Sequence, residues 1–442
     1  RAVYEIRNIS EEASTTSEGT FADHRSATPT DRHAVLSPEL QRESEKHIHL
    51  KRYLSTLPMD DIGVPEYRRS LTPEDNRSGG KNLIYPVNKE VLIHIYPGIA
   101  GDRDCYVPVE PDCGPAVTDL LRQVDEQLAV DIDQLEALAS SESKEQGLLD
   151  CLDRICLSAS GRLEPDPMTL DIGGWEGLRY LMVREKVGLG KIQPLIDDPY
   201  IEDVSCSGVG SVFLEHRIFG GLKSSVAFDS GNELDRFVIK LSERIGRPAT
   251  TRDPLIDSVL PDGSRINIVY GDDVSRKGSN FTIRKFSDAP LSVLDLIDSG
   301  TLSYDMAAYV WLMVAGGMNI FVSGETASGK TTLLNSISTF IDPDGKVVSI
   351  EDTPELQIPH ENWTREVVRG SAVGESAVSM FDLLRSALRQ RPDEILIGEI
   401  RGEEGAVVFQ AMQTGHPCMA TFHASTVEKL IQRLTGQPIN IP

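Results

Sequence analysis

The chain has 442 residues, of which 40% are hydrophobic and 25% are charged, and its formal net charge is −24 at pH 7. This length supports two or three domains with buried cores, and the composition is ordinary for a globular protein. The acidic balance argues against nucleic acid as the main partner, because DNA binding draws most of its affinity from Lys and Arg on phosphates. Only 14 of the 44 basic residues are Lys, which is typical of a protein from a halophile, with an acidic mesophilic enzyme as the alternative.

Cysteine content and hydropathy point to an intracellular protein. The spacings of the cysteines match no standard zinc pattern, and their number is too small for a disulfide framework: Cys105, Cys113, Cys151, Cys156, Cys206 and Cys418. The sequence begins at Arg1 without a signal peptide, and we expect its true start to be missing. The most apolar window, residues 306–322, contains Gly316 and Gly317 and is short for a membrane span, so it predicts a buried helix and a buried strand.

The amino-acid pattern of the first part of the chain changes near residue 81, from polar sequence to periodic apolar segments. Residues 1–80 are polar and lack sustained periodicity, which predicts a flexible, disordered arm with one short helix near residues 38–57. Residues 81–164 predict an α/β subdomain with strands at 91–96 and 105–109 and helices at 116–138 and 144–157. Residues 165–288 predict an α+β domain with helices at 175–186 and 232–245 and strands at 201–205, 212–216, 266–270 and 281–284.

Residues 289–442 alternate apolar strands with amphipathic helices. The strands are expected at 319–323, 347–350, 394–398 and 418–422, and the helices at 330–340, 379–389, 403–414 and 427–434. This alternation predicts an α/β domain with a parallel sheet covered by helices on both faces.

A phosphate-binding loop begins where the first of these strands ends. The pattern G-x-x-x-x-G-K-[ST] is matched in full by Gly324, Glu325, Thr326, Ala327, Ser328, Gly329, Lys330 and Thr331, and Thr332 follows. The glycines let successive N–H groups turn toward phosphate oxygens, and the helix that starts near Lys330 adds its positive end. Lys330 is expected to reach the β- and γ-phosphates and Thr331 to ligate Mg²⁺.

Carboxylates and histidines at other strand ends are candidates to complete the site. Glu351 and Asp352 end one strand and Glu399 ends another, where an NTPase needs an acid near the metal or the attacking water. His416 and His423 flank the strand at 418–422 and are candidate phosphate sensors. Solvated or helix-capping acids and ordinary surface histidines are the alternative interpretation.

Four motifs together resemble the secretion ATPases that power type II secretion, type IV pili and the archaellum. They are the P-loop at 324–331, an aspartate box at 349–355, an atypical Walker B at 396–399 and a histidine box at 414–423. The resemblance covers residues 165–442, and more weakly 81–164, and implies a RecA-like P-loop NTPase domain preceded by an α+β, PAS-like N-terminal domain. It implies ATP and Mg²⁺ as cofactors and a homo-hexamer at the inner face of the cell membrane. That hexamer would act on a polytopic membrane platform protein and, indirectly, on pilin-like subunits, without nucleic acid.

The resemblance also implies roles for individual residues. Glu399 falls on the Walker B acid, which holds Mg²⁺ through water, and Glu351 falls on the aspartate-box glutamate. Either acid can activate the attacking water, and we favour Glu351 as the base. His416 and His423 fall on the histidine-box pair. Three arginines of the N-terminal domain are expected to reach the γ-phosphate, with surface ion pairs as the alternative: Arg217, Arg265 and Arg284.

The sequence thus predicts an ATP-hydrolysing hexameric motor that assembles an archaeal type IV pilus-like filament. An archaellum motor or a type II-like secretion ATPase is the alternative within the family. A nucleic-acid motor is disfavoured by the charge, and a module that binds ATP without turnover is the third hypothesis. The family's ATPase domain continues past the elements found here, so we expect a domain truncated at its C-terminus.

Overall fold

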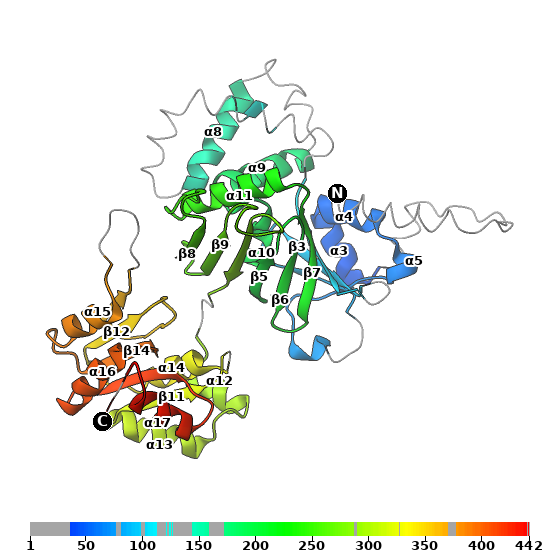
Figure 1. The fold of residues 1–442 in the computed structure, drawn as a ribbon. Helices are drawn as coiled ribbons and strands as arrows, with labels where there is room; N and C mark the ends of the chain where they lie inside the picture. The colour runs from blue at the N-terminus through cyan, green and yellow to red at the C-terminus, as the bar shows by residue number, and fades with distance from the viewer. Residues whose placement is uncertain are drawn as a thin grey trace, which may run out of the picture. The chain divides into compact units, whose positions relative to one another are not determined.

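The computed structural model describes residues 36–76, 81–98, 102–112, 121, 123–124, 126, 144–158, 172–286, 290–326, 328–369, 377–439 and 441 (Figure 1). The chain divides into two compact units, Arg1–Lys285 and Phe286–Pro442.

The first unit is built on a ten-stranded sheet with the order β1-β2-β3-β4-β7-β6-β5-β10-β9-β8. Its strands are β1 Glu66–Tyr67, β2 Leu83–Pro86, β3 Leu92–Tyr96, β4 Cys105–Val109, β5 Ile201–Cys206, β6 Gly210–His216, β7 Gly220–Phe228, β8 Leu255–Val259, β9 Arg265–Val269 and β10 Asn280–Arg284. The pairs β1–β2 and β4–β7 are parallel and the other pairs are antiparallel. The parallel pair β4–β7 joins residues before and after position 164 into one sheet.

Residues 36–76 differ from the flexible arm that we expected over residues 1–80. They form the helices α3 Pro38–Lys46, α4 Ile48–Thr56 and α5 Met59–Ile62 and the short 3-10 helix η1 Pro73–Asn76. Leu40, Leu50 and Leu54 are buried in one cluster with Leu92 and Val109 of the sheet. The helix expected near residues 38–57 is thus confirmed as the pair α3 and α4, which are separated at His47, whereas α5, β1 and η1 were not predicted.

The remaining helices of this unit are α8 Lys144–Ser158, α9 Ile172–Lys186, η4 Gly190–Ile192, α10 Gln193–Asp197 and α11 Gly231–Arg244. The helix expected at 116–138 lies mostly outside the described residues. Ser230 caps α11 by accepting a hydrogen bond from the Glu233 N–H. The apolar face of α11, with Leu234, Val238 and Leu241, packs into the main core of the unit.

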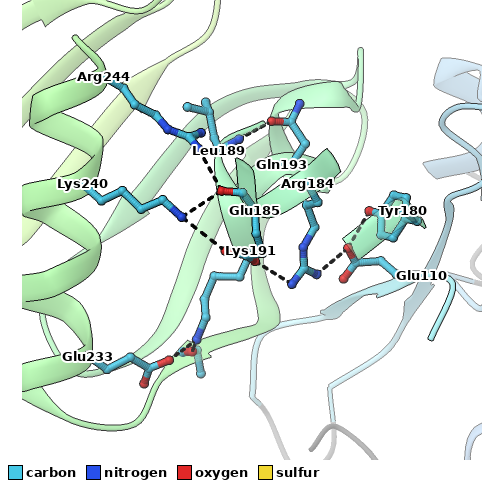
Figure 2. A network of polar contacts seen from close by, with 11 residues as sticks. Glu110, Tyr180, Arg184, Glu185, Leu189, Lys191, Gln193, Glu233, Lys240 and Arg244 are labelled. Atoms are coloured by element: carbon cyan, nitrogen blue, oxygen red, sulfur yellow. Dashed lines mark hydrogen bonds and ion pairs between the residues drawn. The ribbon is translucent and has the colours of Figure 1, made fainter. Parts of the chain in front are cut away.

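The end of α9 is held by cations of α11 (Figure 2). Arg244 Nη2 and Lys240 Nζ donate to the Glu185 carbonyl oxygen at 2.9 and 2.8 Å. The last carbonyls of a helix lack intrahelical partners and carry the negative end of its dipole, so two cations satisfy them well. On the other side, Arg184 Nη1 donates to Glu110 Oε1 at 2.8 Å, which ties α9 to the segment after β4.

A buried aspartate connects several parts of the first unit. Asp198 accepts hydrogen bonds from the hydroxyls of Tyr85 and Tyr106 at 2.6 and 2.7 Å. Its side chain also accepts the Tyr200 N–H at 2.9 Å. Burial raises the pKa of Asp198 against the lowering effect of these donors. Lys285, at the end of the unit, donates to the Asp198 carbonyl.

The second unit contains the α/β arrangement that the sequence predicts. Its strands are β11 Ile320–Gly324, β12 Val347–Glu351, β13 Trp363–Val367, β14 Glu394–Ile400 and β15 Cys418–His423, in the order β11-β15-β14-β12-β13. Every pair is parallel, which confirms the expected fold class. The helices are α12 Val293–Asp298, α13 Tyr304–Ala315, α14 Lys330–Ser338, α15 Met380–Ala387, α16 Glu404–Gln413 and α17 Val427–Thr435.

Alternate residues of each central strand belong to different cores. Ile395 and Ile397 of β14 pack with α15 and α16, whereas Leu396 between them packs with α14. Since neighbouring side chains of a strand point to opposite faces, helices cover both faces of this sheet, as expected.

Helix α13 is less buried than the apolar window predicted. Ala307 and Val314 are buried, but Tyr309, Trp311 and Leu312 are 63%, 57% and 66% exposed. The hydropathy of the window reports apolar content and not which neighbour covers each face. Within the described ranges, no helix is both long enough and apolar enough to cross a membrane.

Candidate functional site

The P-loop connects the end of β11 to the start of α14. Gly329, directly before α14, has φ +82°, a left-handed conformation that favours glycine. A Cβ on Gly324 would lie 2.4 Å from Ser328 Oγ, so the Ser328 side chain would have to rotate away to admit one. Lys330 Nζ donates to the Glu325 carbonyl at 2.7 Å, across the turn of the loop. Ala327 lies outside the described residues.

The parallel register brings the other candidate residues to the same sheet edge. Gly324 pairs with His423 at the ends of β11 and β15. Ile397 of β14 pairs with Ala420 and with Ile350 of β12, so Glu399 and Glu351 follow at the carboxyl ends of their strands. Ligands of parallel α/β sheets bind outside the carboxyl ends of the strands.

A chain of polar contacts runs from the P-loop lysine across this edge. Lys330 Nζ lies 3.5 Å from His423 Nδ1, and His423 Nε2 lies 3.0 Å from Glu399 Oε1. The other carboxylate oxygen of Glu399 accepts from Arg401 Nη2 at 2.7 Å, and Arg401 Nη1 lies 3.6 Å from Asp352 Oδ2. Partial burial would raise the pKa of Glu399, but Arg401 and His423 hold it below the ordinary value. Glu399 is therefore ionised at neutral pH.

Glu351 lies in a different environment from Glu399. It is 1% exposed, and its Oε1 accepts the N–H groups of Glu355 and Leu356 at 2.7 and 2.8 Å. Its Oε2 faces Arg365 Nε at 3.3 Å. Burial raises the pKa of Glu351, and this effect outweighs the hydrogen bonds and the arginine charge. The pKa of Glu351 is thus raised and the pKa of Glu399 is lowered. Opposite shifts of this kind suit a general base and an acid on the metal side.

The two predicted histidines do not lie together. His416 precedes β15 and contacts Thr414 Oγ1 through its Nδ1 at 3.2 Å, whereas His423 ends the strand. Seven residues of extended chain separate them by roughly 20 Å. The structure therefore brings His423, and not His416, to the P-loop.

The three predicted arginines lie in the first unit, at one end of four neighbouring strands. Arg265 of β9 is directly opposite Arg284 of β10, and Arg217 follows β6 and donates its N–H to the Tyr200 carbonyl before β5. Arg217 lies 3.5 Å from Glu202 and Arg265 lies 3.2 Å from Asp257. Arg217 and Arg265 therefore each meet a carboxylate, in the surface ion pairs that the sequence analysis gave as the alternative.

A cavity of about 540 Å³ opens beside the P-loop. It is lined by Gly324, Glu325, Thr326, His423, Ala424, Ser425, Lys429, Gln432, Arg433 and Gln437. The sequence interpretation missed Lys429 and Arg433 of α17 and also Arg401. The available signal was the i, i+4 spacing of Lys429 and Arg433 on the helix that follows the histidine box.

Comparisons with known proteins place relatives along most of the chain. The family model described as type II/IV secretion system protein matches residues 185–440. An uncharacterized protein of Methanocaldococcus jannaschii is 40% identical over 416 residues, which are 91% of this chain and 75% of that protein. Protein VirB11 of Agrobacterium fabrum is 29% identical over 267 residues, 54% of this chain and 77% of that protein. The solved structure of the Legionella pneumophila ATPase DotB is 24% identical with a TM-score of 0.41, covering 54% of this chain and 66% of that one.

Proposed function

The chain belongs to the type II/IV secretion system protein family and is a P-loop ATPase, and on that premise we propose that it is the motor of an archaeal pilus-like filament. The proposal of ATP hydrolysis rests on one observation: Lys330, His423 and Glu399 lie together at the carboxyl-end edge of the sheet. We further propose that the protein works as a homo-hexamer in the cytoplasm, at the inner face of the membrane, on a platform protein. Filament subunits would then move without touching the ATPase.

The P-loop fits the phosphates of ATP. Its glycine-dependent fold leaves backbone N–H groups and the start of α14 to receive anionic oxygens, and Lys330 supplies a mobile positive charge. In the structure that charge rests on a neutral carbonyl, Glu325 O, so a phosphate can replace this partner with a charged one.

Mg²⁺ fits the same edge, because the Thr331 hydroxyl is in the first turn of α14 and the Glu399 carboxylate is ionised. When bound, the ion would neutralise charge on the β- and γ-phosphates. Thr331 and Glu399 are the residues that would hold it, the latter through water. Thr332 follows Thr331 in the same turn of α14.

The opposite pKa shifts of Glu351 and Glu399 support different roles for the two acids. A general base works best when its pKa lies near the working pH, and burial moves the pKa of Glu351 in that direction. We propose Glu351 as the group that takes the proton of the attacking water and Glu399 as the metal-side acid. His423 would orient Glu399 and sense the phosphate. We propose that Arg217, Arg265 and Arg284 of the N-terminal unit contact the γ-phosphate. Of the two histidines expected to sense the phosphate, we propose His423 before His416, because His416 lies far from the P-loop.

The test separates binding from turnover. We expect Lys330→Ala to lose binding of both ATP and ADP, whereas Glu351→Gln and Glu399→Gln keep binding and lose at least about 100-fold in turnover. Glu361→Gln, an exposed acid of the same unit, is the matched control and should behave as the wild type. Full turnover in Glu351→Gln would transfer the base role to Glu399.

The oligomeric part needs its own measurement. ATP turnover per subunit at high KCl should rise with protein concentration if subunits complete each other's sites. A flat rate over a 100-fold concentration range would contradict the ring, and strong stimulation by DNA would favour a nucleic-acid motor instead.

A further inference from the structure

Helix α17 gives the P-loop cavity a cationic wall. Lys429 and Arg433 are one turn apart on α17, and both line the cavity together with Gly324, Glu325 and Thr326. In a chain with a net charge of −24, two cations and only one acid among the lining residues mark a local reversal of charge. Such a cavity favours an anionic ligand.

Both cations are anchored to the end of β15. Arg433 Nη1 donates to the His423 carbonyl at 2.8 Å, and Lys429 Nζ donates to Ser425 Oγ at 2.8 Å. These partners are neutral oxygens. Among the ion pairs of the described residues, neither side chain meets a carboxylate, so their charges are available to a ligand in the cavity.

The position of the P-loop lysine identifies the part of the nucleotide that would face this wall. Lys330 Nζ, which is expected at the β- and γ-phosphates, lies 3.5 Å from His423, and His423 lines the cavity. The wall therefore lies next to the lysine that is expected at the terminal phosphates.

We propose that Arg433, assisted by Lys429, binds the γ-phosphate of ATP within the same subunit and makes the site prefer ATP over ADP. The proposal rests on the nucleotide site proposed above. An arginine suits this task because its planar fork can hold two phosphate oxygens at once. Arg433 is hydrogen-bonded to the His423 carbonyl, and His423 contacts Glu399. A movement of Arg433 on loss of the γ-phosphate would therefore shift His423 and its contact with Glu399.

The experiment compares two nucleotides that differ by the terminal phosphate. Calorimetric titration with Mg²⁺–AMP-PNP and with Mg²⁺–ADP is done on the full chain and on the variants Arg433→Gln, Arg433→Lys and Lys429→Gln. Arg389→Gln, which removes an exposed arginine of the same unit that does not line the cavity, is the control. We expect Arg433→Gln to weaken AMP-PNP about tenfold and ADP less than twofold. Arg433→Lys should restore part of the difference, and Lys429→Gln should give a smaller loss of the same selectivity.

The outcomes are distinguishable. If the wild type binds neither nucleotide, the proposed function fails and this inference fails with it. If the wild type binds both and Arg433→Gln leaves their affinity ratio unchanged, the inference is refuted while the nucleotide site stands. An equal loss for both nucleotides, with a lowered melting temperature, would assign Arg433 a structural role at the end of β15. Arg433→Gln removes the hydrogen bond to the His423 carbonyl and could therefore fail to fold. In that case Lys429→Gln, which keeps this hydrogen bond, tests the preference for AMP-PNP over ADP.

Discussion

Glu394 is a buried acid whose ionisation should weaken the second unit as the pH rises. It begins β14, is 4% exposed, and its Oε1 has no hydrogen-bond partner among the described residues. Burial raises its pKa from the ordinary 4.5 to about 8. The folded chain therefore binds more protons than the unfolded chain between these values, and its stability falls as the pH rises from about 4.5 through 8.

The size of the effect follows from the shift. At about 1.4 kcal/mol per pKa unit, the difference between 4.5 and about 8 amounts to about 5 kcal/mol when the group is fully ionised in both states. Water that enters around the ionised group reduces this penalty. We expect about 2–3 kcal/mol of lost unfolding free energy between pH 5 and pH 8 from this one residue.

Glu394→Gln removes the titration and keeps the size of the side chain. Urea unfolding of wild type and variant, followed by tryptophan fluorescence at pH 5, 6, 7 and 8, isolates the contribution of Glu394 as the change in their difference. The variant should gain about 2–3 kcal/mol relative to the wild type between the two ends of this range. Glu361→Gln, which removes an exposed acid, should show no such gain. Parallel pH profiles for wild type and Glu394→Gln would refute the assignment of a raised pKa.

Three further substitutions test the site and the two cores. Gly329→Ala puts a side chain at a φ of +82°, so it should weaken ATP binding at least about tenfold while the melting temperature changes by no more than a few degrees; intact binding would show that the loop relaxes freely. Asp198→Ala leaves two buried tyrosine hydroxyls without their acceptor and should cost the first unit about 2–5 kcal/mol in chemical denaturation, whereas an exposed control such as Asp272→Ala should cost less than about 0.5 kcal/mol. Leu384→Ala empties a fully buried position of α15 and should cost about 2–5 kcal/mol; a loss below about 1 kcal/mol would mean that the core around α15 collapses to fill the space.

The family and the second unit could be predicted because the information there is local. The P-loop, the aspartate box and the Walker B each occupy a few consecutive residues, and their order along the chain is characteristic. The resemblance is confirmed by the family match over residues 185–440. The four predicted strands of this unit are apolar runs bounded by turns, so all four are found near the expected positions.

What the sequence did not reveal depends on contacts between distant residues. Strand β7 escaped prediction because it begins with two glycines and because a serine, Ser224, occupies a buried position of its alternation. The cations of α17 escaped because β15 brings them beside a loop that lies about a hundred residues earlier in the chain. The opposite shifts of Glu351 and Glu399 likewise depend on burial and on Arg401, which no spacing encodes.

The parallel pair β4–β7 has a practical consequence for dissecting this protein. Cys105 and Tyr106 pair with Lys223 and Ser224, so a fragment that starts near residue 165 would leave β7 with a bare edge. It would also strip the Tyr106 hydroxyl from Asp198, deep in the remaining core. Open strand edges template aggregation. Recombinant fragments of the first unit should therefore retain the residues from α3 onward, and a failure of shorter fragments to stay in solution would be a property of the cut rather than of the protein.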